Sequence, residues 1–452
     1  MPTGNRLASI ASVLARIKPE PRAEPITDPR AVDATYRQWR ARTLWGCFAG
    51  YVVYYLCRRN IPLALPGIAA ELRQSKAALG MIESAGHAAY GIGKFANGVL
   101  ADRANPRYFM ALGLLLTALA NVAFGSASSL PILVLIWGLN GWFQSMGFPP
   151  GARLLSHWFA PREHGWIWGI YGCSHQVGTA VISVAAGYLV AFGWRHAFLA
   201  PAAVAVLMSA ILCNRLRDVP SSMGLPPVEF YRGDVTDART LEALEKPLNA
   251  RQALLGYVLN DKLIWFVAFG NFFLYVARYG VNTWLPTFLS EERGMSIAAA
   301  GWLSAVFEAG GVLGMLAAGW ISDHLFRAAR GPVMALFMAL LSLAMFASWR
   351  SHSLPMYVLA LAACGFLVYG PLMLVSVAAA GFAGKKAAAT AAGFCGFWGY
   401  MGAVVSGAGV GKIVDMAGWR AGFALLIASC LLGSLFFALT GNARPRGWVE
   451  KT

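Results

Sequence analysis

The chain has few charged residues and lacks the motifs of nucleotide-driven or metal-dependent proteins. Only 13% of its 452 residues are Asp, Glu, Lys or Arg, whereas 58% are hydrophobic. A typical soluble domain carries about 25% charged residues. No Gly-x-x-x-x-Gly-Lys-Ser/Thr motif occurs, so the sequence offers no phosphate-cradling loop for ATP. We therefore expect a polytopic membrane protein that is not an enzyme.

The cysteines and the N-terminal segment also exclude several classes. None of the cysteines has the spacing of a metal site, so neither a disulfide framework nor a bound metal or cofactor is expected. Residues 1–42 lack the apolar core of a signal peptide and are expected to form a partly disordered cytoplasmic tail. The seven cysteines lie in or beside apolar runs, at Cys47, Cys57, Cys173, Cys213, Cys364, Cys395 and Cys430.

Twelve apolar runs are long enough to cross a bilayer, which needs about 20 residues per helix. The longest polar interruption, residues 214–262, divides them six and six. The expected organisation is an N-terminal tail (1–42), a six-helix bundle (43–213), a cytoplasmic linker (214–262), a second bundle (263–440) and a C-terminal tail (441–452). The runs are 43–65, 78–100, 108–126, 129–157, 165–191, 195–213, 264–290, 298–321, 332–350, 354–382, 388–415 and 419–440.

The positive charge is unevenly distributed. The net charge is +16, and most of the 37 Lys and Arg fall on the side that holds both termini and the 214–262 loop. This bias predicts a multi-pass protein of a bacterial inner membrane with both termini in the cytoplasm. Because anionic lipid accounts for the basic side, we expect the bilayer as a partner and no nucleic acid.

The two halves repeat each other at a nearly constant offset. Arg58 and Arg278 each lie in an apolar run and are 220 residues apart. The loop motif Gly-x-x-x-Asp recurs 221 residues on, at Asp102 and Asp323, each followed by arginines. Such pairs can form in one conformation and break in another, so we predict a gating role for Asp102, Arg103, Asp323 and Arg327.

Buried positive charge points to the ligand. A charged side chain near the middle of a bilayer costs on the order of 3 kcal/mol, and the apolar runs contain more cations than acids. Arg58, Arg278 and Lys94 therefore predict an anionic ligand. Guanidinium presents planar, paired donors that match phosphate oxygens, and His175 has an ordinary pKa suited to sensing phosphate charge.

Structural roles remain open for several of these residues. Arg59 points about 100° away from Arg58 on a helix, which suits helix packing equally well. Lys94 could pair with Glu83 or Glu308 instead of a ligand. His175 could be a hydrogen-bonded packing residue, and tyrosines commonly fill helix interfaces.

Several motifs resemble those of one family, the organophosphate:phosphate antiporters of the major facilitator superfamily, and most of all its members that carry glycerol 3-phosphate. The matching motifs run from about residue 43 to 440 and include Tyr-Tyr-Leu-Cys-Arg-Arg-Asn around Arg58, the Cys-x-His at His175 and Tyr-Val-x-Arg-Tyr-Gly around Arg278. The resemblance implies an all-α fold of twelve transmembrane helices in two six-helix bundles. One departure is Thr283, where the glycerol-3-phosphate members have an aspartate.

The resemblance also assigns roles to residues by position. It implies that Arg58 and Arg278 bind phosphate, that Lys94 and His175 support them, and that Glu308 pairs with a basic group when the site is empty. The positions that correspond to cavity-lining aromatics in the family are Tyr54, Tyr90, Trp142, Tyr275, Tyr369 and Tyr400.

The function expected from this resemblance is exchange of inorganic phosphate for a small organic phosphate by a monomer that alternates between two open states. A three-carbon phosphate is favoured over a hexose phosphate. Two alternatives remain open: a membrane sensor that binds organic phosphate without transporting it, and a proton symporter of a phosphonate or carboxylate.

Overall fold

The computed structural model describes residues 20–160, 163–232, 253–327, 329–351, 353–384, 387–441 and 443–444, and these form helices and loops without a strand. The first half contains α2 (Pro29–Leu56), α3 (Ile61–Leu72), α4 (Lys76–Arg103), α5 (Pro106–Ser126), α6 (Leu130–Gln144), α7 (Phe148–Trp158), α8 (His164–Leu189) and α9 (His196–Arg215). The second contains α13 (Lys262–Arg293), α14 (Ile297–His324), α15 (Arg330–Arg350), α16 (Leu354–Ala383), α17 (Ala388–Val404), the π-helix η5 (Val405–Gly409) and α18 (Val410–Ala438). Short helices η2 (Val190–Phe192), η3 (Pro220–Met223), α10 (Val228–Tyr231) and η4 (Ala253–Val258) lie in the connections.

Each predicted span coincides with one helix or with two helices separated by a break. Within the described residues, eight segments are by themselves long and apolar enough to cross a membrane. The count is below twelve because α2 begins with a polar extension at Pro29, and α6 and α7 divide one span. The last such segment, Thr390–Ala438, joins two predicted spans that turn at Gly418, where φ is 73°.

The first span breaks between α2 and α3 for a local reason. Pro62 has no N–H to donate to the carbonyl of Arg58, so the helix cannot continue through this point. The carbonyl of Cys57 instead accepts hydrogen bonds from the side-chain amides of Asn121 (3.0 Å) and Asn140 (3.2 Å). Buried asparagines thus replace the missing backbone bonds, and the turn that carries Arg58 is fixed.

The sequence repeat reappears in the backbone. Arg73 and Gly294, 221 residues apart, both have left-handed φ angles, of 52° and 60°. Each precedes a serine, Ser75 or Ser296, whose side chain caps the next long helix by accepting a backbone N–H. The two halves therefore begin their second long helix with the same turn.

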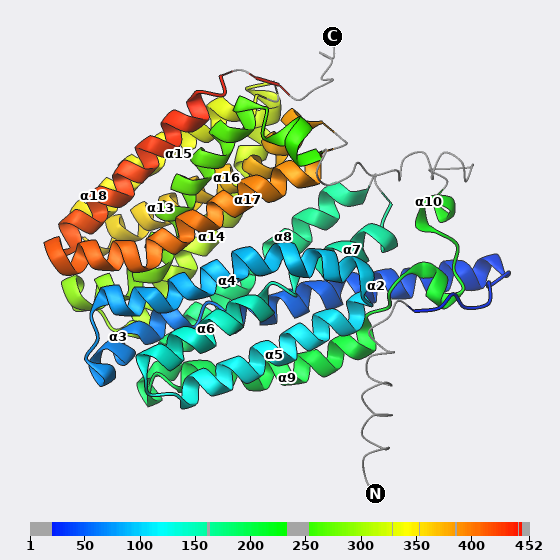
Figure 1. Cartoon of the computed structure of the whole chain (residues 1–452), viewed down its shortest axis with the longest axis horizontal. Coiled ribbons are helices and arrows are strands. Elements are labelled where there is room, and N and C mark those ends of the chain that lie inside the picture. Colours follow the sequence, from blue (N-terminus) through cyan, green and yellow to red (C-terminus); the bar gives the residue numbers. More distant parts are fainter. Residues whose placement is uncertain are drawn as a thin grey trace, which may run out of the picture.

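The helices form two groups, α2–α9 and α13–α18, which meet at one end and spread apart towards the other (Figure 1). The meeting end holds α3, the start of α4 and the bend in α18. There the Ser84 hydroxyl donates to the Val404 carbonyl at 2.6 Å, and the Ala77 N–H donates to Asp415 at 2.7 Å. These bonds join the groups directly, so this end is closed.

Candidate functional site: two buried arginines around a tyrosine cluster

Arg58 and Arg278 occupy corresponding places in the two halves. Arg58 lies in the turn after α2, and Arg278 lies in the middle of α13; they are only 7% and 4% exposed. The guanidinium carbon of Arg58 is 3.9 Å from the ring centre of Tyr90, and that of Arg278 is 4.6 Å from the ring centre of Tyr369. Each guanidinium is thus held against an aromatic face, a favourable environment for a cation.

Three tyrosines connect the two arginines. Tyr90 lies 4.8 Å from Tyr400, and Tyr400 lies 5.4 Å from Tyr275, measured between ring centres. Arg278 is 5.9 Å from Tyr275. The first group of helices supplies Tyr90 and the second supplies the other two, so this cluster lies between the groups and faces both arginines.

A second series of rings connects the same arginines through His175. The ring of Tyr55 is 5.4 Å from Arg58 and 5.6 Å from His175, and His175 is 6.0 Å from Tyr369. The Nδ1 atom of His175 is bonded to the Gly172 carbonyl, which leaves the far side of the imidazole towards the tyrosines. His175 therefore lies on the predicted site and not on a remote packing surface.

Glu308 reaches Arg278 through a hydroxyl. Arg278 donates to the Tyr369 hydroxyl at 3.1 Å, and that hydroxyl donates to a carboxylate oxygen of Glu308 at 2.6 Å. The other carboxylate oxygen of Glu308 and the Nε of Arg278 have no hydrogen-bond partner among the described residues. The relay leaves bonding capacity on both charged groups.

Arg59 is also part of the site, which the helical prediction did not establish. Its guanidinium carbon is 4.5 Å from the ring centre of Tyr279, and that of Arg278 is 5.1 Å from the same ring. Arg59 and Glu308 also line one small cavity with about 10 Å³ of free space, roughly room for one water molecule. The signal in the sequence was Pro62, which breaks the helix and redirects the side chains before it.

Lys94 lies where the two groups approach each other. Its Nζ atom is 5.9 Å from the ring centre of Tyr400 and 6.0 Å from that of Phe148. A methyl group added at Gly396 would lie 3.9 Å from the same atom. Lys94 therefore adds a half-buried ammonium beside the tyrosine cluster.

The arginines of this site lack counter-charges. Within the described part of the chain, no ion pair shorter than 4 Å involves Arg58, Arg59 or Arg278, and each keeps at least one buried N–H without a partner. Of the two buried acids, Glu83 lies 3.8 Å from His87 and Glu308 is bonded to a tyrosine. Buried charges without partners are costly, so this arrangement suits an anionic ligand.

The site occurs in a recognisable protein family. A model of the Major Facilitator Superfamily matches residues 47–407 and, in an overlapping match, 267–451. The chain belongs to the Major Facilitator Superfamily. It is 41% identical to the "Probable hexose phosphate transport protein" of Chlamydia pneumoniae, over 96% of this chain and 98% of that one. It is 40% identical to the "Glycerol-3-phosphate transporter" of Bacillus subtilis, over 95% and 98%.

Another relative and a solved structure complete the comparison. The "Membrane sensor protein UhpC" of Salmonella typhimurium is 36% identical over 96% of this chain and 99% of its own. A bacterial homologue of the lysosomal transporter Spinster shares the fold, with a TM-score of 0.72 at 16% identity over 89% of this chain and 97% of that one. The predicted resemblance and the all-α facilitator fold of this superfamily member are confirmed.

Two predicted aromatic residues of this superfamily member lie apart from the arginines. The Tyr54 hydroxyl donates to the Met110 carbonyl at 2.8 Å, and the side chain is fully buried in the packing of the first half. Trp142, on α6, is 36% exposed and lies beside Gly93 of α4. A role in ligand binding stays a prediction for both.

The loop motifs are described only in the second half. Asp323, at the end of α14, pairs with Arg330 at the start of α15. Arg327 lies between them in a left-handed conformation with φ of 46°. The side chains of Asp102 and Arg103 lie outside the described residues. The gating role of these four predicted residues remains a prediction.

Proposed function

We propose that this chain is a secondary transporter that exchanges inorganic phosphate for a small organic phosphate. The observation that carries the proposal is the pair Arg58 and Arg278, one from each half, with unpaired donors on both sides of a shared tyrosine cluster. A phosphate dianion would supply the missing charge and accept the free N–H groups.

Alternating access follows from this placement. A ligand held by both halves stabilises their approach, whereas the empty site keeps cations that repel one another. The closed end, which carries the turns at Arg73 and Gly294, is the external end by the distribution of positive charge. The other end, with both termini, faces the cytoplasm of a bacterial inner membrane. We also propose that the bundles comprise residues 43–213 and 263–440 and that the protein acts as a monomer.

A three-carbon phosphate is the first organic substrate to test and a hexose phosphate the second. Relatives named for glycerol 3-phosphate and for hexose phosphate are almost equally similar, so identity does not separate them. The small cavity beside Arg59 and Glu308 and another beside Arg58, each with about 10 Å³ of free space, favour the smaller compound.

Counterflow in proteoliposomes tests the proposal. Vesicles loaded with inorganic phosphate should take up labelled phosphate, and external glycerol 3-phosphate should compete with it. A sensor, which the two UhpC relatives make the second candidate, would bind without exchange. A proton symporter would need a pH gradient and no internal phosphate. Uptake that is independent of internal phosphate would contradict the exchange mechanism.

A further inference from the structure

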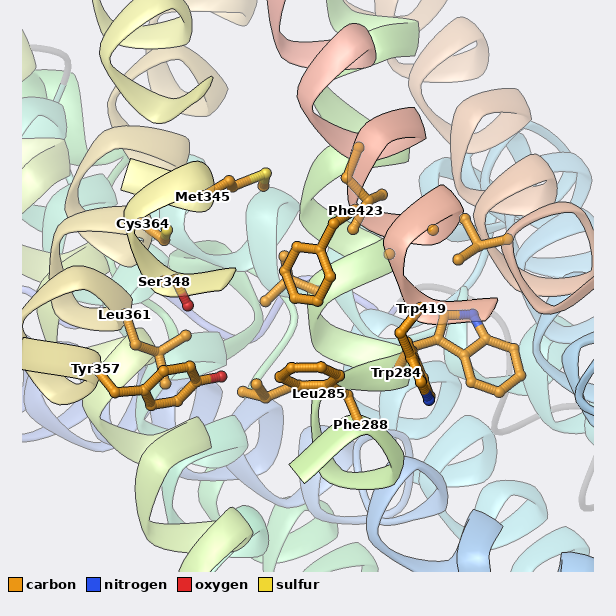
Figure 2. A pocket seen from close by; sticks show the side chains of 15 residues that line it. Trp284, Leu285, Phe288, Met345, Ser348, Tyr357, Leu361, Cys364, Trp419 and Phe423 are labelled. Carbon is orange, nitrogen blue, oxygen red and sulfur yellow. The ribbon is translucent and has the colours of Figure 1, made fainter. Parts of the chain in front are cut away.

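A second site lies away from the tyrosine cluster, inside the second half near the closed end. It begins with a narrow cavity between α13, α15, α16 and α18 that encloses about 490 Å³ of empty space, including its mouth. Figure 2 shows the rings of Phe288 and Phe423 facing this space, with Leu361 on its other side. Among its lining side chains, only Ser348, Tyr357 and the two tryptophans carry a polar atom, so the cavity suits a hydrocarbon chain.

A wider, basic cavity adjoins this apolar one. It encloses about 1020 Å³ of empty space, again including its mouth, and Phe288 and Trp419 line both cavities. Three arginines surround it, Arg293, Arg350 and Arg420, against one acid, Glu292. A polar compartment with excess positive charge therefore opens directly onto an apolar one.

These arginines have unused donors. Among the described residues, Arg350 and Arg420 are exposed and take part in no ion pair. Arg293 donates to the Trp349 carbonyl at 3.2 Å and lies 5.5 Å from the ring centre of Tyr357. The Tyr357 hydroxyl is buried and has no hydrogen-bond partner in the same described part. The site thus offers several donors to an anion at its rim and one further inside.

The depth of the arginines identifies the source of such an anion. Arg293 ends α13 and Arg350 ends α15, so both lie where the predicted spans reach the membrane surface. At this depth the phosphates are those of lipid headgroups, and basic pockets between transmembrane helices bind such groups. A soluble phosphate would leave the apolar cavity unused.

We infer that this pair of cavities binds one anionic phospholipid, with its phosphate among Arg293, Arg350 and Arg420 and one acyl chain beside Phe288, Leu361 and Phe423. A zwitterionic lipid fits less well, because its ammonium group would meet the same excess of arginine.

The lipid lies next to a contact that closes the transporter. The Trp419 indole donates to Glu291 at 3.0 Å, and Glu291 pairs with Lys76 of the first half at 3.1 Å. Trp419 also lines both cavities, so a bound lipid packs against the residue that supports this contact between the halves. The lipid therefore stabilises the closed end.

Photo-crosslinking of the full chain in nanodiscs tests the inference. The probe is phosphatidylglycerol with a diazirine in one acyl chain, compared with phosphatidylcholine that carries the same chain. Phosphatidylglycerol should label peptides of α13, α15, α16 and α18 around the apolar cavity at least fivefold more than phosphatidylcholine. Equal labelling by both lipids, or labelling spread evenly over the outer surface, would show ordinary boundary lipid and overturn the inference.

Variants give the matched comparison. The double variant Arg350→Gln with Arg420→Gln should lose most of the specific labelling, because it removes headgroup partners without breaking an ion pair. Arg73→Gln, at an exposed arginine of the same end in the first half, should label like the unaltered chain. Thermal unfolding of both variants verifies folding. Unchanged labelling of a folded double variant would also overturn the inference, whether or not the chain exchanges phosphate.

Discussion

Arg59 and Arg278, which come from different halves of the chain, lie against the same tyrosine ring. Their guanidinium carbons are 4.5 and 5.1 Å from the centre of Tyr279. The phenol thus separates two like charges that no described acid neutralises directly. A doubly negative ligand beside this ring would interact with both arginines, and the predictions below follow from this arrangement.

Arg278→Lys should reduce phosphate exchange at least a hundredfold. Lysine keeps the charge but loses the planar donors and the bond to the Tyr369 hydroxyl. Uptake of labelled phosphate into phosphate-loaded proteoliposomes measures this. Arg73→Lys, at an exposed position, is the control and should exchange normally. Near-normal exchange by Arg278→Lys would place the phosphate elsewhere.

Arg59→Met should lower exchange by at least tenfold. If Arg59 only packed helices, methionine would fill a similar volume and preserve activity, whereas a ligand-facing cation cannot be replaced by an apolar side chain. The phosphate concentration for half-maximal exchange should rise in this variant. Activity equal to that of the unaltered chain would restore the packing interpretation.

Tyr369→Phe should weaken phosphate binding about tenfold, because it removes the hydroxyl that links Arg278 to Glu308 and leaves both partly unsatisfied. Tyr357→Phe is the matched control: it lies on the same helix, and its hydroxyl has no partner among the described residues. Competition of unlabelled phosphate against labelled uptake gives both affinities. Equal affinities would show that the relay does not contribute.

Gly80→Ala should hold the protein away from the closed state. A methyl group at Gly80 would lie 2.4 Å from the carbonyl oxygen of Gly407 on the opposite half, so the two backbones could not approach as they do. Exchange should fall strongly, and spin-label distances across this end should lengthen. Gly169→Ala, whose methyl group meets no described atom within 4 Å, should change neither. Unaltered distances in Gly80→Ala would contradict the assignment of this end as closed.

Glu71 should contribute to stability in a pH-dependent way. Hydrogen bonds from Arg195 and then Trp194 lower the pKa of Glu71 to about 2 from its ordinary 4.5. The carboxylate therefore stabilises the fold above about pH 4.5, and this contribution is lost as the pH falls towards 2. The pair is partly exposed, so the loss should be below about 1 kcal/mol.

Thermal unfolding between pH 6 and 3 measures this contribution. The difference between the unaltered chain and Glu71→Gln should shrink as the pH falls. Glu292→Gln, at an exposed acid without an ion pair among the described residues, should show no such trend. A difference that grows on acidification would have the wrong sign for a lowered pKa.

Much of the site could be predicted because its signals are local or repeated. Arg58 and Arg278 stood out through their cost in an apolar run and their 220-residue spacing, and His175 and Lys94 followed from motif matches. Arg59, Tyr55 and Tyr279 were not predicted as site residues. Their directions depend on the break at Pro62 and on the approach of the other half, which helical periodicity does not describe. For the same reason the motif match did not reveal that the Tyr54 hydroxyl bonds to Met110.

Composition, the positions of the apolar runs and the internal repeat were enough to establish a two-part helical membrane protein with a buried cation in each half, because burial energies act on every residue regardless of its neighbours. Which rings lie between the arginines, which end is closed and where a lipid-shaped cavity forms depended on the packing of segments hundreds of residues apart. Such contacts arise only from side chains of both halves meeting in space, and spacing along one chain cannot specify them.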